Sequence, residues 1–286
     1  MSLSAEELDS INADLWTMSP PCQPFTRQGN QKDIEDNRTN PLRHIQREMT
    51  KMKNLPKYFF LENVKGFETS LARDQLISTL KQCGYHFREF LLSPNQFGIP
   101  NSRLRYYLVA KANADFRLEC DRLITETVVN QSPTRLIAEY MEDKPEAYFE
   151  KFLVDDKLLL KYAEIFDITS AESCRSCCFT KAYSHYVRGT GSVIQQAAVD
   201  INEIYTLFRQ SASNEEKLQQ IQKLKLRFFT PKEILNLSGF GKDFSFPGET
   251  SLRQQYQLLG NSINVDVVAH LLEILLSNTL HSKPIC

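Results

Sequence analysis

The first 111 residues alternate between segments typical of strands and segments typical of helices. The run KYFFLENV (57–64) is almost continuously apolar, as in a strand covered on both faces of its sheet. Residues 42–53 and 70–84 carry apolar side chains at helical spacing, and Gly84 closes the second helix. This alternation predicts an α/β layer with a mainly parallel sheet. The other expected strands are 14–18, 86–92 and 103–110.

The alternation is lost after residue 111. Residues 112–240 are first helix-rich and charged, then irregular and polar, which predicts a second, smaller domain or a large insertion. A clear helix start follows near its end: Thr230 can cap, Pro231 suits the first helical position, and Glu233 completes a capping box.

The composition is that of an ordinary globular chain, with 42% hydrophobic and 24% charged residues among 286. The longest clean apolar run, VDVVAHLLEILL, contains Asp266, His270 and Glu273, so we expect no membrane span and no membrane partner. The first 15 residues are acidic and polar, unlike a signal peptide. We therefore expect a cytoplasmic or nuclear protein.

The chain has seven cysteines, an odd number that favours free thiols in a reducing compartment. Cys174 and Cys177 have the two-residue spacing of a zinc knuckle, but no second such pair completes four ligands. We therefore predict no metal site.

The net charge of −1 gives no global preference for nucleic acid, although basic residues gather locally. Each group has two readings, a phosphate-binding surface or a solvated helix face. The groups are Lys51, Lys53, Lys57 and Lys65; Arg103, Arg105 and Lys111; and Lys223, Lys225, Arg227 and Lys232.

Cys22 follows the strand expected at 14–18. A lone cysteine is usually a small core hydrophobe. Pro20 and Pro21, however, make the chain leave its strand in a rigid turn, at the strand end where functional groups of α/β sheets collect. Packing thiol and nucleophile both remain open on these grounds.

Three more polar residues stand at expected strand ends. Glu62 closes the run 57–64 and is either a solvated end or a buried carboxyl group that donates a proton near neutral pH. Arg103 and Arg105 are two residues apart at the start of a strand, which predicts side chains on one face. Such a pair suits a bound anion or carbonyl group, or an ordinary ion-paired surface.

Five motifs of this chain, in this order, resemble those of the cytosine-5 methyltransferases. Each alone is common, but the ordered set spans nearly the whole chain. The motifs are Pro-Pro-Cys (20–22), Glu-Asn-Val (62–64), Arg-x-Arg (103–105), RFFTPKE (227–233) and GNSINVDVV (260–268).

Within that family, SPPCQPFTRQG, LLENVKGFE and GIPNSRLRYYLVA are most similar to the branch that methylates a cytosine in the anticodon loop of tRNA-Asp. Cys-Phe-Thr at 178–180 is similar to that branch's hallmark in its target-recognition region. The resemblance therefore implies tRNA, and tRNA-Asp in particular, as the partner.

The resemblance also implies a fold: the Rossmann-like sheet of an S-adenosylmethionine-dependent methyltransferase, N-terminally incomplete, with a smaller target-recognition domain. It divides the chain into a partial catalytic domain at 1–111, a target-recognition region at 112–240, and a C-terminal segment at 241–286 that returns to the catalytic domain.

The chemistry that the resemblance implies uses the residues found above. Cys22 would attack carbon-6 of cytosine, Glu62 would hold ring N3 and the exocyclic amine, and Arg103 with Arg105 would hold the base carbonyl oxygen or a phosphate. The methyl group would come from S-adenosylmethionine, and no metal is needed. The cofactor-binding residues carried over from the family motifs are Ser19, Asn261 and Ser262.

One family feature is not found in this sequence. Family members begin with a glycine-rich turn that cradles the cofactor, whereas the first glycine here is Gly29, beyond Cys22. We therefore expect an incomplete cofactor site and weak activity; low-micromolar binding of S-adenosylmethionine in a calorimetric titration would overturn that expectation.

Two alternative functions remain open from the sequence. The motifs alone also fit a DNA cytosine-5 methyltransferase. A catalytically inactive tRNA-binding or regulatory isoform would work through the region after residue 111 and the basic groups. The oligomeric state is left open by the sequence.

Overall fold

The computed structural model describes residues 3–25, 33–112, 116, 122–126 and 133–277, and these form two compact units. Unit 1 holds the described residues of Met1–Gln96, Leu104–Asn130 and Val267–Cys286, and unit 2 those of Phe97–Arg103 and Gln131–Asp266. Residues 241–266 thus lie in unit 2, and the chain returns to unit 1 at Val267 rather than at residue 241.

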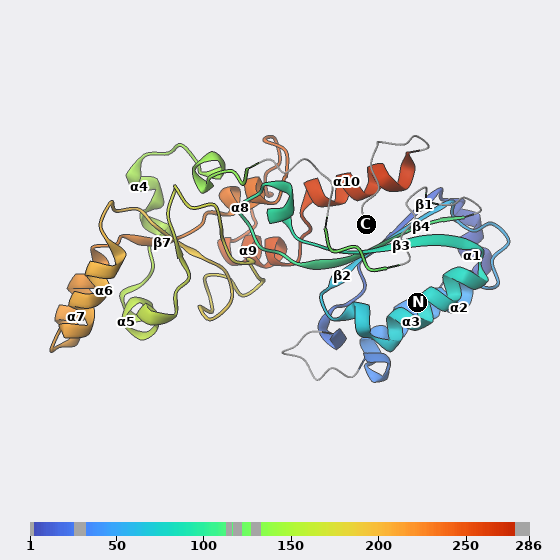
Figure 1. Cartoon of the computed structure of the whole chain (residues 1–286), viewed down its shortest axis with the longest axis horizontal. Helices are drawn as coiled ribbons and strands as arrows, with labels where there is room; N and C mark the ends of the chain where they lie inside the picture. Colours follow the sequence, from blue (N-terminus) through green and yellow to red (C-terminus); the bar gives the residue numbers. More distant parts are fainter. Residues whose placement is uncertain (1–2, 26–32, 113–115, 117–121, 127–132, 278–286) are drawn as a thin grey trace. The chain divides into compact units, whose positions relative to one another are not determined.

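Unit 1 is built on a four-stranded sheet in the order β1-β2-β4-β3 (Figure 1). Only β1 and β2 are parallel, whereas β2–β4 and β3–β4 are antiparallel, so the prediction of a mainly parallel sheet is wrong. The reason is the link between β3 and β4, which has only the short 3₁₀ turn Pro94–Phe97 and no crossover helix. The strands are β1 (Leu15–Met18), β2 (Tyr58–Val64), β3 (Tyr85–Leu92) and β4 (Arg105–Ala112).

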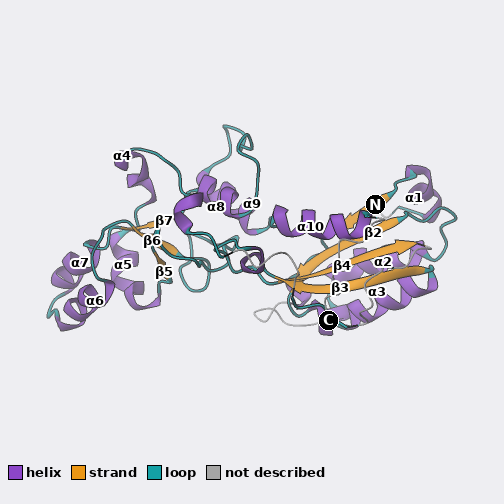
Figure 2. Ribbon diagram, turned by 45° about the horizontal axis from the view of Figure 1, so that its top comes forward, coloured by secondary structure: helices purple, strands orange, loops and turns teal. Residues whose placement is uncertain are grey.

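Helices cover both faces of this sheet. Figures 1 and 2 show α2 (Asn40–Met49) and α3 (Leu71–Gln82) on one face and α10 (Val265–Leu276) on the other, while α1 (Ala5–Ile11) precedes β1. The core between sheet and helices is apolar. It includes Leu42, Met49, Phe59, Leu61, Leu76, Leu80 and Leu108.

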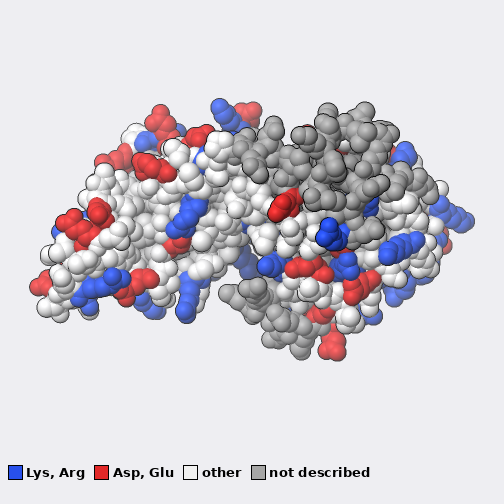
Figure 3. All heavy atoms as spheres, viewed as in Figure 1, with Lys and Arg blue, Asp and Glu red and all other residues white. Residues whose placement is uncertain are grey.

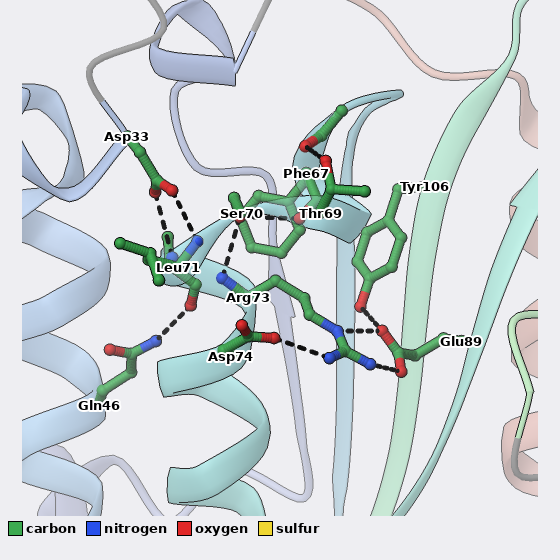
Figure 4. Close-up of polar contacts among 12 residues, drawn as sticks. Asp33, Gln46, Phe67, Thr69, Ser70, Leu71, Arg73, Asp74, Glu89 and Tyr106 are labelled. Carbon is green, nitrogen blue, oxygen red and sulfur yellow. Dashed lines mark hydrogen bonds and ion pairs between the residues drawn. The ribbon is translucent and has the colours of Figure 1, made fainter.

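The position of α3 is fixed by polar contacts at its start (Figure 4). The Asp33 carboxylate accepts hydrogen bonds from the backbone of Leu71 and Ala72 at 2.6 and 3.1 Å. Arg73 donates from Nε to Glu89 on β3 at 2.8 Å, and the Tyr106 hydroxyl of β4 donates to the same carboxylate at 2.7 Å. Burial raises the pKa of Tyr106, so its hydroxyl group remains a donor and the helix stays tied to both strands.

Unit 2 combines a small sheet, in the order β5-β6-β7, with six short helices. Its core is aromatic: the Phe179 ring meets Tyr183 edge-on at 5.0 Å and Phe229 at 5.1 Å, and the Tyr256 hydroxyl donates to the Phe229 carbonyl at 2.7 Å. The strands are β5 (Ile168–Thr169), β6 (Val193–Gln195) and β7 (Leu226–Phe228). The helices are α4 (Glu146–Phe149), α5 (Asp156–Tyr162), α6 (Ile201–Gln210), α7 (Asn214–Gln222), α8 (Pro231–Leu237) and α9 (Leu252–Gly260).

The predicted start of α8 is confirmed. Thr230 caps the helix, Pro231 occupies its first turn, and Glu233 completes the capping box. Glu233 also forms an ion pair with Arg227 of β7, both Nη atoms lying 2.8 Å from the carboxylate oxygens, and both side chains are fully buried. The Arg227 guanidinium stacks 4.4 Å from the Phe149 ring centroid. The basic motif at 227 is therefore part of the core and not a phosphate-binding surface.

Replacing Glu233 with alanine is expected to lower the free energy of unfolding by about 3–5 kcal/mol, because it leaves the Arg227 charge buried without its partner. Denaturant unfolding measures the loss. Glu216→Ala is the matched control, since Glu216 holds the same capping-box position on α7 but is exposed. Equal losses in the two variants would show that the buried ion pair contributes nothing beyond the cap.

Contrary to the sequence prediction, one described segment, Leu252–Leu276, is long and apolar enough to cross a membrane. The structure divides it into α9 and α10, separated by residues 261–264. Both helices bury one apolar face, with Tyr256 in α9 and Leu271 in α10 fully covered. A buried core helix passes the same test of length and composition, so this segment is weak evidence for a membrane span.

Candidate active site

Three chain segments meet at one edge of the unit 1 sheet. Because β1 and β2 are parallel, with Met18 opposite Leu61, the residues that follow both strands lie at the same edge. Since β4 runs antiparallel to β2, with Arg105 opposite Val64, the start of β4 lies there too. The sheet topology thus brings three predicted site residues to one edge: Cys22, Glu62 and Arg105.

Glu62 is buried, with 8% of its surface exposed, and it lies inside β2, two residues before the strand ends at Val64. Its carboxylate accepts a hydrogen bond from the Ser19 hydroxyl and lies 3.5 Å from Arg105 Nε. The carboxyl group is therefore held in a defined orientation from two sides. Ser19, predicted to bind the cofactor, acts here as a partner of Glu62.

The turn that carries Cys22 is fixed to β2. Asn63 donates from Nδ2 to the Pro20 carbonyl at 3.2 Å, and its own Oδ1 accepts from the Val64 amide at 2.8 Å. The Cys22 carbonyl accepts from Phe25 N at 2.9 Å, closing a short turn, and the Cys22 side chain remains partly exposed. Asn63 is thus a positioning residue for the turn, a role the sequence alone did not indicate.

A further charged residue near Cys22 was not predicted. The pKa of Arg38 is raised, first by its hydrogen bond to Asp36 and to a smaller extent by the negative charge of a Cys22 thiolate. Arg38 lies on the 3₁₀ turn Asn37–Thr39, which packs against the turn Gln23–Phe25 that directly follows Cys22. Its sequence, DNRTN, carries no motif that would single it out.

Arg103 lies in unit 2 and in different surroundings from Arg105. β4 begins at Arg105, so Arg103 stands before the strand, and the alternation that predicted a shared face does not apply to it. Its Nη1 is 3.5 Å from both Cys178 Sγ and the Phe179 carbonyl, and its Nη2 donates to the carbonyl groups of Gly260, at 3.4 Å, and of Ser262. These contacts link, through Arg103, the Cys-Phe-Thr motif at 178–180 to the Gly-Asn-Ser motif at 260–262, which lie far apart in the sequence.

The same two motifs touch at Gly260. A Cβ atom added there would lie 1.9 Å from the Lys181 backbone nitrogen and 2.2 Å from the Thr180 carbonyl carbon. Only glycine permits this approach of two backbones. We call this contact the Arg103 joint; it consists of Arg103, Cys178–Lys181 and Gly260–Ser262.

Of the three predicted cofactor residues, Asn261 and Ser262 have polar side-chain groups that are available to a ligand. The side chains of Asn261 and Ser262 make no hydrogen bond to any residue that the structure describes, and Asn261 is exposed. An amide and a hydroxyl group suit the amino-acid or ribose part of S-adenosylmethionine. These residues therefore fit the cofactor, whereas the Ser19 hydroxyl is already engaged by Glu62.

The described cysteines are free thiols. Cys174 is exposed, and Cys177 lies beside Asp167, with burial as the main cause of its raised pKa. Within the described ranges, no three His, Cys, Asp or Glu side chains gather in a way that could hold a metal ion.

The chain is similar to known proteins over almost its whole length. Residues 2–277 match the family model described as C-5 cytosine-specific DNA methylase. A Bos taurus protein named tRNA (cytosine(38)-C(5))-methyltransferase is 40% identical over 96% of this chain and 84% of its own length. A Dictyostelium discoideum protein named DNA (cytosine-5)-methyltransferase is 39% identical over 96% of this chain and 80% of its own.

A crystal structure of a Spodoptera frugiperda DNMT2 mutant superimposes with a TM-score of 0.85, at 40% identity, covering 96% of this chain and 83% of that one. The family match, the shared fold and the ordered motifs agree. The chain belongs to the C-5 cytosine-specific methylase family, whose methyl donor is S-adenosylmethionine.

Proposed function

We propose that this chain is a tRNA methyltransferase that modifies carbon-5 of a cytosine in the anticodon loop of tRNA-Asp. The observation that carries the proposal is the sheet edge where Cys22 follows β1 and the oriented Glu62 carboxyl group lies near the end of β2, beside Arg105. The choice of tRNA as substrate is supported by relatives that are about 40% identical to this chain and are named tRNA (cytosine(38)-C(5))-methyltransferases.

In this proposal Cys22 is the nucleophile. Its thiolate adds to carbon-6 of cytosine, forming a C–S bond and making carbon-5 nucleophilic. Glu62 binds the N3 and 4-amino edge of the ring and offsets the charge that builds there. Arg105, 3.5 Å from the Glu62 carboxylate, keeps that carboxyl group in place.

S-adenosylmethionine, when bound, supplies an electrophilic methyl group for carbon-5. Asn261 and Ser262 are the residues proposed to hold it. After the transfer, loss of the carbon-5 proton to a base restores the double bond and expels the Cys22 thiolate. The target cytosine must leave its stack with neighbouring nucleobases to be reached, which costs less free energy in an RNA loop than in a duplex.

The experiment is methyl transfer from labelled S-adenosylmethionine to tRNA-Asp and to duplex DNA, measured side by side. We expect label in tRNA-Asp, confined to one anticodon-loop cytosine, and background label in DNA. Label in DNA with none in tRNA would contradict the proposal and favour the function in the name of the Dictyostelium relative.

We further propose a cytoplasmic or nuclear location. The support is the free state of the five described cysteines, which suits a reducing compartment. Fractionation of cells that express a tagged chain tests this.

A further inference from the structure

An open groove with a volume of about 1250 Å³ runs along the outer surface of α2 and α3, which lie side by side in Figure 1. We call it the α2–α3 groove. Arg43, His44 and Arg47 line it from α2, and Gln75, Ser78 and Thr79 line it from α3. It belongs entirely to unit 1 and does not include Cys22, Glu62 or Arg105.

The groove walls carry positive charge only. None of its lining residues is an aspartate or a glutamate, whereas most of its other side chains are amides and hydroxyl groups. On the face drawn in Figure 3, by contrast, acidic and basic side chains are interspersed. In a chain with a net charge of −1, such a groove is a local site for an anionic ligand.

Two arginines are placed to meet that ligand. Arg43 and Arg47 are one helical turn apart, so both project from the same face of α2. Arg43 is exposed and makes no hydrogen bond or ion pair with any residue in the described part of the chain.

Arg47 is held by its neighbours. Its Nη2 lies 2.9 Å from His44 Nδ1, whose Nε2 lies 2.7 Å from the Leu3 carbonyl, so a neutral His44 accepts from Arg47 and donates to Leu3. Arg47 Nε is 3.3 Å from Glu48, which also binds Lys51 at 2.9 Å. The Glu48 charge is therefore shared, and the Arg47 side chain, which lines the groove, stays 66% exposed.

We propose that the α2–α3 groove binds the phosphodiester backbone of the tRNA substrate, outside the catalytic edge. This inference rests on the proposed function for the identity of the ligand. Arginines with amide and hydroxyl donors suit the phosphate and 2′-hydroxyl groups of an RNA backbone.

The groove also begins close to the catalytic edge along the chain. Asn37 and Asn40 line the groove beside Arg38, and the turn Asn37–Thr39 packs against the turn Gln23–Phe25 that directly follows Cys22. An RNA strand that presents its cytosine to Cys22 therefore has a polar path onto α2.

The test compares tRNA affinity and its salt dependence in three variants. Arg43→Glu changes a side chain without described contacts, and Arg43→Glu/Arg47→Glu changes both groove arginines. The control is Lys81→Glu, matched to the single variant, which reverses the charge of an exposed lysine of α3 that does not line the groove. Thermal unfolding of each variant confirms that it folds.

We expect the double groove variant to bind tRNA about tenfold or more weakly near 0.1 M salt, with a salt slope smaller by about 1.5 to 2. The single variant should show roughly half that change in slope. KM for tRNA should rise while kcat at saturating tRNA stays unchanged.

Unchanged affinity and slope in the groove variants would overturn the inference, and so would a loss in the Lys81→Glu control equal to that of Arg43→Glu. The inference would also be overturned if the groove variants lost binding to polyglutamate but kept native binding to tRNA, because that result would indicate an acidic protein as the ligand. If the native chain binds tRNA but transfers no methyl group, only the proposed function is contradicted. The binding measurements on the variants still test whether the α2–α3 groove binds tRNA.

Discussion

Replacing Cys22 with serine is expected to lower kcat for methyl transfer to tRNA by about 10⁴-fold or more. The thiolate supplies the bond to carbon-6, and a hydroxyl group is a far weaker nucleophile at neutral pH. The substitution removes one partly exposed sulfur atom and leaves the contacts of Asn63 with the turn intact. Labelled methyl transfer under single-turnover conditions measures the loss.

The matched control is Cys83→Ser. Cys83 is another partly buried free thiol of unit 1, at the end of α3, and it should retain the rate. Both variants should bind tRNA within about twofold of the native chain, because neither changes a charge that meets phosphate. Near-native turnover by Cys22→Ser would contradict the assignment of the nucleophile.

Replacing Gly260 with alanine is expected to destabilise unit 2 by about 3 kcal/mol or more, because the added carbon meets backbone atoms and not a flexible side chain. The nearest are the Lys181 nitrogen, at 1.9 Å, and the Thr180 carbonyl carbon, at 2.2 Å. Relief of this clash must separate the two halves of the Arg103 joint and lengthen the contact of Arg103 with the Gly260 carbonyl group. Denaturant unfolding followed by far-ultraviolet circular dichroism measures the loss, because the single tryptophan, Trp16, lies in unit 1.

Gly241→Ala is the matched control, because a Cβ atom there meets nothing within 4 Å. It should change the free energy of unfolding by less than about 1 kcal/mol. If the two alanine variants had equal free energies of unfolding, the close approach of the two backbones at Gly260 would not contribute to stability. A stable Gly260→Ala variant with intact tRNA binding would contradict the joint as well.

The strands of unit 1 could be predicted because each is an apolar run bounded by polar turns. Their directions could not, because hydrophobicity along one strand carries no information on its pairing. The link between β3 and β4 has no helix, and this feature of the sequence was the available signal for an antiparallel pair. The α8 start was predictable because capping is local, involving only Thr230 to Glu233.

The site was predictable to a similar degree. Cys22 and Glu62 stand at the ends of parallel neighbouring strands, so strand prediction alone brings them to one edge. The Arg103 joint was not foreseen, because it depends on residues 75 or more positions apart that only the fold of unit 2 brings together. Asn63 positions the turn that carries Cys22, and Arg38 supplies a charge near that turn. Neither role produces a periodic pattern in the sequence, so neither residue could be predicted.

Covalent trapping tests the central claim most directly. In tRNA-Asp with 5-fluorocytosine at the target position, carbon-5 has no proton to lose after methylation, so the bond between Cys22 and carbon-6 should persist. We predict a complex stable to denaturing electrophoresis that requires S-adenosylmethionine, with the tRNA fragment attached to the peptide containing Cys22. A complex that forms equally with Cys22→Ala, or none while unsubstituted tRNA-Asp is methylated, would contradict the account.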